Sequence, residues 1–197
     1  VDGVIYADLA IGGSGSGLGQ SYTIPTSSGF KKYKVTQESY SGSFGTGKVI
    51  APVSGSSGNE RFYVMALGNV DSSTHQFWSS RGTSVVTSTD FGTGESNTTA
   101  MKAKSGSSSY LWGISAVQSG TWDGSRGWYV PSIGEWSAFA DQLDITTSNY
   151  SSKGLSDYYW SSSQYSTNFA WIAYFYYGYF ERDSVNINIY VRLGTTF

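Results

Sequence analysis

The segment 169–190, FAWIAYFYYGYFERDSVNINIY, constrains this chain more than any other stretch, because nine of its 22 residues are aromatic. Rings at this density must either be buried in a core or form a contact surface. Period-two alternation favours burial for one set of residues, which forms the apolar face of a predicted strand: Val185, Ile187, Ile189, Val191 and Leu193. Three further residues are predicted to point inward: Trp171, Ala173 and Phe175.

The tyrosines of the same segment favour a contact surface. Ile172, Tyr174 and Tyr176 occupy the opposite face of the predicted strand, and Tyr177 and Tyr179 follow. So many tyrosines cannot all be buried with satisfied hydroxyls at one small sheet edge. Tyrosine mixed with Ser, Asn, Asp and Gly is the composition of antibody paratopes. We therefore expect an exposed binding surface here.

Composition excludes several classes of function. Charged residues make up 13% of the 197-residue chain and the net charge is −2, so no basic footprint for nucleic acid is present. No run reaches the ~18 apolar residues of a membrane span, and we expect no membrane insertion. There is no cysteine for disulfides or thiolate chemistry.

The order of predicted elements indicates an α+β fold. The segment 61–70, RFYVMALGNV, is the best candidate for a central strand. Short strands rich in β-branched and aromatic residues precede it, at 4–11, 21–25, 31–36 and 48–53. We expect a β-rich N-terminal segment over residues 1–60, packed on or part of the main domain, and a ligand-binding domain over residues 61–197.

The strongest helix signal lies at 131–143, PSIGEWSAFADQL. Ser132 and Glu135 form an S-x-x-E capping box. One apolar face follows at helical spacing: Ile133, Trp136, Phe139, Ala140 and Leu143. Weaker helices are predicted at 97–105, with Asn97 as the cap, and at 108–119.

Catalytic and metal constellations are weak. His75 is the only histidine, and although Asp71, Ser72 and Ser73 are close in sequence, no nucleophile motif such as G-x-S-x-G is present. One histidine without cysteine disfavours zinc. Glu181 and Asp183 flank Arg182, which indicates a solvated mixed-charge tip. We predict no catalytic residue, no metal and no cofactor; a hydrolase using His75 and the acidic pair is the third hypothesis.

The last 70 or so residues, from Gly127 to Phe197, carry a family resemblance. The blocks GWYVPSIGEWSAFADQL, GLSDYYWSSSQYSTNFAW and YVRLGTTF follow in this order. Together they resemble the variable proteins of diversity-generating retroelements. The upstream stretches RFYVMALGNV, FGTGESNT and YLWGISAVQ are also similar to that family. The resemblance implies a C-type-lectin fold of the formylglycine-generating-enzyme branch, with a mixed or antiparallel sheet and about two helices.

In that family a reverse transcriptase copies a template with errors at adenines and overwrites the 3′ end of the gene. The resemblance implies a constant scaffold made of Trp160, Trp171, Ala173, Phe175, Gly178, Tyr190, Val191 and Arg192. It also implies a variable region over about 157–190, whose ligand-binding positions would be Asp157, Tyr158, Phe169, Ile172, Tyr174, Tyr176, Tyr177, Tyr179, Glu181, Arg182, Asp183, Ser184, Asn186, Ile187, Asn188 and Ile189. Ile187 and Ile189 are thus expected to be exposed by the resemblance and buried by the period-two pattern.

The chain departs from sugar-binding C-type lectins, since it has neither their cysteines nor an E-P-N or Q-P-D calcium motif. Formylglycine-generating activity also needs cysteines, so that chemistry is not implied. The expected function is non-enzymatic binding of a macromolecular ligand, a protein or a surface glycan, by a hypervariable protein on a phage tail or a bacterial cell surface. The alternative is a constant structural, adhesive or carbohydrate-binding module of the same fold.

Overall fold

The fold is described from a computed structural model. It describes residues 3–10, 21–26, 29–34, 39–42, 45–48, 60–79, 81–117, 128–142 and 145–196. Two α-helices and several antiparallel sheets lie within these ranges, so the chain is α+β, as predicted. No helix in the described ranges combines the length and apolar character that crossing a bilayer requires.

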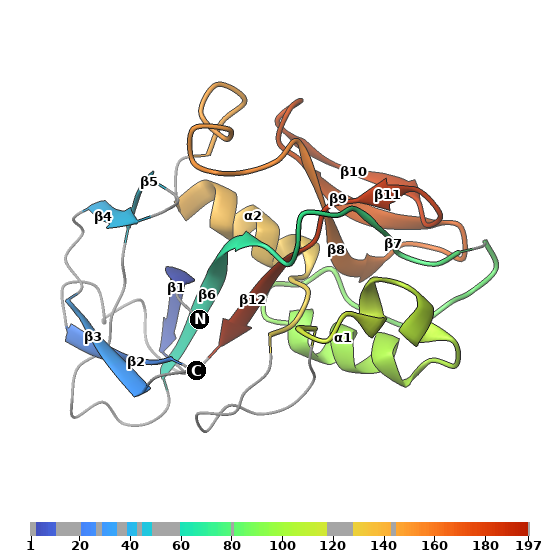
Figure 1. Ribbon diagram of the computed structural model, residues 1–197, viewed down its shortest axis with the longest axis horizontal. Helices are drawn as coiled ribbons and strands as arrows, with labels where there is room; N and C mark the ends of the chain where they lie inside the picture. The colour runs from blue at the N-terminus through green and yellow to red at the C-terminus, as the bar shows by residue number, and fades with distance from the viewer. Residues whose placement is uncertain are drawn as a thin grey trace.

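Strand β6 (Glu60–Asn69) is the centre of one sheet, which confirms the central strand predicted at 61–70. It pairs antiparallel with β1 (Gly3–Ala10) on one side and with β12 (Arg192–Thr196) on the other. The first and last described strands of the chain are therefore hydrogen-bonded to the same neighbour (Figure 1). Residues before and after position 60 thus share one sheet.

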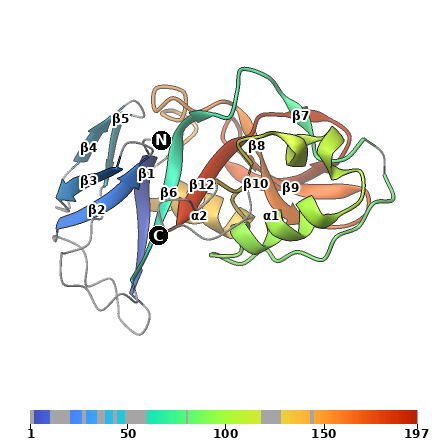
Figure 2. The same cartoon turned by 60° about the horizontal axis from the view of Figure 1, so that its bottom comes forward.

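Two hairpins follow β1. They are formed by β2 (Ser21–Thr26) with β3 (Gly29–Lys34) and by β4 (Ser39–Gly42) with β5 (Gly45–Lys48). Both lie at the end of the molecule away from the second sheet (Figures 1 and 2). Most of the strand predicted at 48–53 falls outside the described residues.

The second sheet contains the aromatic segment. It has the order β10 (Tyr179–Ser184), β9 (Phe169–Tyr174), β8 (Tyr158–Gln164), and both pairs are antiparallel. A short antiparallel pair lies beside it, formed by β7 (His75–Gln76) and β11 (Asn188–Ile189).

Helix α1 (Gly94–Ala103) begins before the predicted position, and Asn97 is not its cap. Asn97 is buried within the helix and exchanges two hydrogen bonds with the Ser88 backbone, its Nδ2 donating to the oxygen at 2.8 Å and its Oδ1 accepting from the nitrogen at 2.9 Å. Asn97 is of a residue type that often caps helices, but here its side chain makes a contact with the backbone of Ser88 instead.

The prediction of an α-helix at 108–119 is wrong. The chain forms two 3₁₀ turns there, η1 (Ser107–Ser109) and η2 (Leu111–Gly113). Leu111 and Trp112 are adjacent and both buried, and Trp112 Nε1 donates to the Phe77 carbonyl at 3.0 Å. The tight i→i+3 turn lets both side chains enter the core, and Gly113 packs against the Ser108 backbone where a Cβ would overlap it.

Helix α2 (Ile133–Gln142) confirms the predicted capping box. The Ser132 N–H donates to Glu135 Oε2 at 2.6 Å, and the Glu135 N–H donates to Ser132 Oγ at 3.2 Å. Trp136 and Phe139 on the predicted apolar face are fully buried. The Trp136 ring stacks on Tyr159 at a centroid distance of 4.9 Å, which ties the helix to β8.

Strand β9 is buried on both faces. On one face Ala170 and Ile172 join a tryptophan cluster that includes Trp78, Trp112 and Trp160. On the other face Ala173, together with Phe175 directly after the strand, joins a helix cluster centred on Trp136 and Phe139 of α2. Each fully buried large apolar side chain contributes about 1.5–3 kcal/mol, so these two clusters fix the sheet.

Glu135 connects the two helices. Its buried carboxylate accepts hydrogen bonds from Ser132, directly before α2, from the backbone of Gly94, the first residue of α1, and from the Tyr129 hydroxyl at 3.2 Å. A Cβ at Gly94 would overlap this carboxylate, which explains the glycine. Burial raises the pKa of Glu135 from 4.5 to about 7, although the hydrogen bonds lower it.

Glu135 should make folding stability depend on pH. Because its pKa is raised to about 7 in the folded protein and is near 4.5 when unfolded, its protonated form favours folding. The free energy of unfolding should be highest below the unfolded pKa and should fall, by at most about 1.4 kcal/mol per pH unit, as pH rises through the folded pKa. In Glu135→Gln the fall should be absent, as measured by urea unfolding across this range. Glu95→Gln on α1 is the control, and equal slopes in wild type and Glu135→Gln would contradict the assignment.

Trp160 and Trp171 should differ in their contribution to stability. Trp160 is fully buried and its Nε1 donates to the His75 carbonyl at 2.7 Å, whereas Trp171 is only half-buried. Trp160→Ala should lower the free energy of unfolding by about 3–5 kcal/mol, and Trp171→Ala by clearly less. Urea unfolding of both variants measures this, and equal losses would show that the two faces of the sheet are not buried as described.

Candidate ligand-binding surface

The tip of the β9–β10 hairpin is a four-residue turn at 175–178 that is anchored at both ends. Phe175 points into the helix cluster, and Gly178 has a φ of +75°, a conformation that side-chain-bearing residues rarely adopt. The Gly178 N–H donates to the Tyr174 carbonyl at 2.9 Å, and the Tyr176 N–H donates to the Asp157 carbonyl at 3.2 Å. The backbone that carries the tyrosines is thus held by the core and by the loop before β8.

Six tyrosines gather around this turn, and we call them the tyrosine surface: Tyr158, Tyr174, Tyr176, Tyr177, Tyr179 and Tyr190. Tyr174 is the cross-strand partner of Tyr179, with ring centroids 5.8 Å apart. Tyr177 lies edge-on to Tyr174 at 4.8 Å and stacks with Tyr179 at 5.8 Å and 16°. Each ring therefore restricts the next, and the surface is pre-arranged in the free protein.

Exposure increases from the sheet to the tip. Tyr158, Tyr174 and Tyr190 are half-buried, and Tyr176, Tyr177 and Tyr179 are 55%, 55% and 46% exposed. The remaining exposed members of the predicted set are Asp157, Phe169, Glu181, Arg182, Asn186 and Asn188. Asp183 and Ile187 are half-buried.

The expectation that every predicted position is exposed is wrong for three residues. Ile172 and Ile189 are each 1% exposed in the tryptophan cluster, and Ser184 is also buried. Ile172 sits opposite Trp160 in the central strand, and Ile189 pairs with His75 across β7 and β11. The period-two pattern predicted that Ile189 is buried, and this prediction is confirmed. Ile187 is half-buried and packs against the same cluster.

The scaffold positions implied by the resemblance are mostly buried. Trp160, Ala173, Phe175, Val191 and Arg192 lie in the interior. Arg192 donates to Asn69 Oδ1 at 3.1 Å and to the Gly154 carbonyl at 2.6 Å, and burial lowers its pKa to about 10. Trp171 and Tyr190 are half-buried.

The exposure of one aromatic residue was not predicted. Tyr165, directly after β8, is 54% exposed and lies edge-on to Trp171 at 6.0 Å. Polar neighbours on both sides were the only sequence signal for its exposure. It lies on the Trp171 side of the sheet and is not part of the tyrosine surface.

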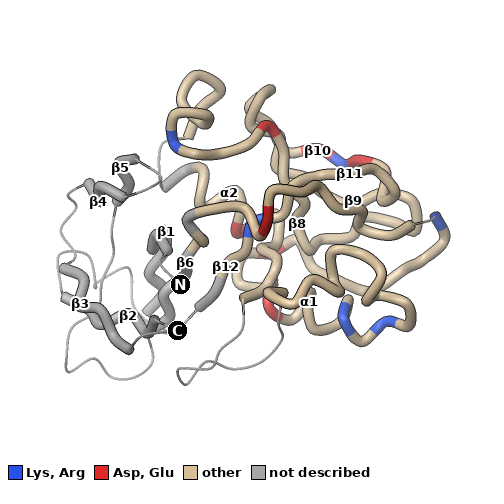
Figure 3. The backbone as a smooth tube through the Cα atoms, viewed as in Figure 1, with Lys and Arg blue, Asp and Glu red and all other residues tan. Residues whose placement is uncertain are grey.

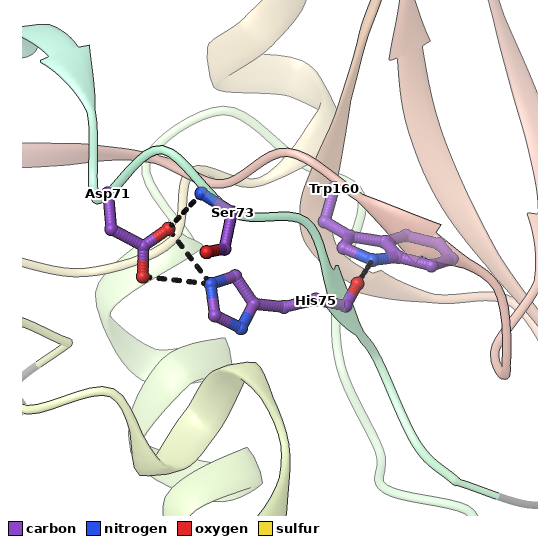
Figure 4. A network of polar contacts seen from close by, with 4 residues as sticks. All are labelled: Asp71, Ser73, His75 and Trp160. Atoms are coloured by element: carbon purple, nitrogen blue, oxygen red, sulfur yellow. Dashed lines mark hydrogen bonds and ion pairs between the residues drawn. The ribbon is translucent and has the colours of Figure 1, made fainter.

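His75 is paired, but not as a catalytic triad (Figure 4). Its Nε2 lies 3.0 Å from both carboxylate oxygens of Asp71, and Ser73 contacts Asp71 through its backbone N–H at 2.9 Å. Burial raises the pKa of Asp71, but the hydrogen bonds from His75 and Ser73 outweigh it and leave that pKa lowered. Ser73 thus joins the pair through its backbone, in the i to i+2 contact of an Asx turn, and not through its hydroxyl.

A shallow depression of about 390 Å³ opens beside His75. His75, Gln76, Tyr110 and Asn188 contribute to its mainly polar wall. Asn188 is one of the predicted ligand-binding positions, so this depression extends the candidate surface from β11 towards η1 and η2. Within the described parts of the chain, no three His, Asp or Glu side chains come together as a metal site.

The exposed tyrosines should contribute little to folding. Tyr176→Ala and Tyr179→Ala should each change the free energy of unfolding by no more than about 1 kcal/mol, because both side chains are about half exposed. Tyr159→Ala, which removes a fully buried ring stacked on Trp136, should lose about 3–5 kcal/mol. Thermal and urea unfolding measure both, and a loss of several kcal/mol at Tyr176 or Tyr179 would place them in the core.

Comparison of the chain with protein-family models, with curated proteins and with solved structures found no match.

Proposed function

We propose that this chain is a non-enzymatic ligand-binding protein that recognises a macromolecular target with the tyrosine surface. One observation carries the proposal: three contacting tyrosines, each about half exposed, project together from the tip of the β9–β10 hairpin, whose turn is anchored in the core. Exposed aromatic patches usually mark interaction sites, since leaving them in water is unfavourable. The contacts between the three rings hold them in one arrangement, which favours a binding role for their exposure.

The geometry also supports tight binding. A tyrosine has only two side-chain torsions to immobilise, and the ring–ring contacts at 4.8–5.8 Å already restrict them. Preorganisation lowers the entropy that association costs. Asn186 and Asn188, which follow β10 and are exposed, add adaptable hydrogen-bonding groups to the predicted contact set.

We further propose that the chain is a variable protein of a diversity-generating retroelement with a C-type-lectin fold, on a phage tail or a bacterial cell surface. The support is the sequence resemblance, the α+β architecture with two helices, and the separation of buried scaffold from exposed positions. Ile172, Ser184 and Ile189 leave the proposed contact set, because they are buried. The gene should then lie beside a reverse transcriptase and a near-identical repeat that differs at adenines.

The alternative is a constant surface module of the same fold that binds carbohydrate. The polar depression lined by His75, Gln76, Tyr110 and Asn188 favours it, because neutral hydroxyl-rich ligands need such groups. A glycan array with and without calcium separates this alternative from protein recognition. Loss of glycan binding in Gln76→Ala, but not in Tyr176→Ala, would favour the depression as the site.

The proposed function is tested with immobilised wild type and the double variant Tyr176→Ala/Tyr179→Ala. Both are screened against a library of random short peptides and against a glycan array. The wild type should select ligands that the double variant loses, with at least about a tenfold weaker dissociation constant. Tyr165→Ala, which removes an equally exposed tyrosine outside the tyrosine surface, is the control and should retain these ligands. If no selected ligand depends on the two tyrosines, the proposal fails.

A further inference from the structure

The edge strand β10 separates its charged side chains between two faces. Side chains alternate along a strand, so Tyr179, Glu181 and Asp183 share one face and Phe180 and Arg182 share the other. Tyr174 of β9 pairs with Tyr179, which places the acidic residues on the face of the tyrosines. Acidic positions on β10 and in the loop before β8 are visible in Figure 3.

The arginines near this strand are directed to other aromatic rings. Arg182 pairs across the strands with Trp171, and its guanidinium lies 4.3 Å from the Tyr165 ring centroid and 5.5 Å from that of Trp171. Arg81 lies over Phe169 at 5.8 Å and donates to Ser184 Oγ at 3.3 Å. Both cations therefore stack on rings outside the tyrosine surface.

Acidic residues lie around the tyrosine surface. Asp157 accepts a hydrogen bond from the Tyr150 hydroxyl at 2.8 Å, and its backbone carbonyl holds Tyr176. This hydrogen bond raises the pKa of Tyr150. The pKa of Tyr174 is also raised, first by burial, then by the neighbouring tyrosines and by the charge of Asp183. Asp183 thus lies within electrostatic reach of Tyr174, Asp157 lies next to Tyr176 and Tyr158 through the backbone, and Glu181 is exposed between Tyr179 and Asp183.

We infer that the partner presents arginine or lysine side chains to the tyrosine surface, an inference that rests on the proposed function. The faces of aromatic rings carry negative potential and attract cations, and the three carboxylates add to that attraction. Guanidinium groups fit best, because they stack flat on rings and also pair with carboxylates. An anionic partner meets like charge at this surface. The ligand is therefore a basic polypeptide segment.

The test uses peptides of equal length that carry several arginines, several citrullines or several glutamates. Citrulline keeps the shape of arginine and removes its charge. Each peptide is titrated into the full chain at low and high salt, with the dissociation constant measured by calorimetry. The arginine peptide should bind at least about tenfold more tightly than the other two. The difference in affinity between the arginine peptide and the other two should shrink at about 1 M salt, where the screening length falls to about 3 Å.

Variants identify the residues responsible. Glu181→Gln/Asp183→Asn should weaken binding of the arginine peptide about tenfold, while the amide oxygen introduced at position 183 would still accept the hydrogen bond of the Ser184 N–H. Asp90→Asn/Glu95→Gln is the matched control: it changes the net charge equally but lies on α1 and the loop before it, and it should not weaken binding (Figure 1). Arg182→Gln, on the other face, should not weaken binding either.

The outcomes separate this inference from the proposed function. Equal binding of the arginine and citrulline peptides, or equal weakening by both acidic double variants, would overturn the inference. So would tyrosine-dependent ligands from the peptide library or glycan array that lack basic groups, which would leave the proposed function standing. If no ligand depends on Tyr176 and Tyr179, both fall.

Discussion

The burial of β9 on both faces is the constraint on which the rest of this structure depends. Ile172 packs with Trp160 on one face, and Ala173 packs with Tyr159 on the other. Side chains alternate between the faces, so a shift of register by one residue would exchange the contents of the two clusters. The register is therefore fixed, and the turn at 175–178 leaves the core at one position. A flexible segment with the same tyrosines would lose much of its affinity to ordering on binding.

Features that depend on neighbours in sequence could be predicted. The capping box of Ser132 and Glu135 joins residues three apart, and the apolar face of α2 repeats at helical spacing, so both follow from local physics. The exposure of Tyr176, Tyr177 and Tyr179 followed from a different argument, because a small sheet cannot satisfy that many buried hydroxyls. Composition was sufficient for these three tyrosines without any knowledge of the fold, although the same argument also placed Ile172 on the exposed face, and Ile172 is buried.

Features that depend on tertiary partners could not be predicted. Period-two alternation assigns one buried face to a strand, but Ile172 lies in a central strand whose second face is covered by tryptophans from distant segments. The resemblance placed Ile189 among the exposed ligand-binding positions because of its place in the family pattern, which does not indicate how deeply a side chain is buried. The alternation of apolar residues predicted its burial correctly. The Asn97 side chain could cap a helix, but in the folded chain it exchanges hydrogen bonds with the backbone of Ser88.

The charges of β10 also oppose self-association of the exposed tyrosine surface. Among the described strands β10 pairs only with β9, so its outer edge is open to pairing with another chain. Glu181, Arg182 and Asp183 place charge at three successive positions of that edge, which opposes such pairing. Because the carboxylates share the face of Tyr179, two copies of the tyrosine surface also repel each other. The same residues that would select a basic ligand therefore discourage the surface from binding itself, so a single arrangement can serve both recognition and solubility.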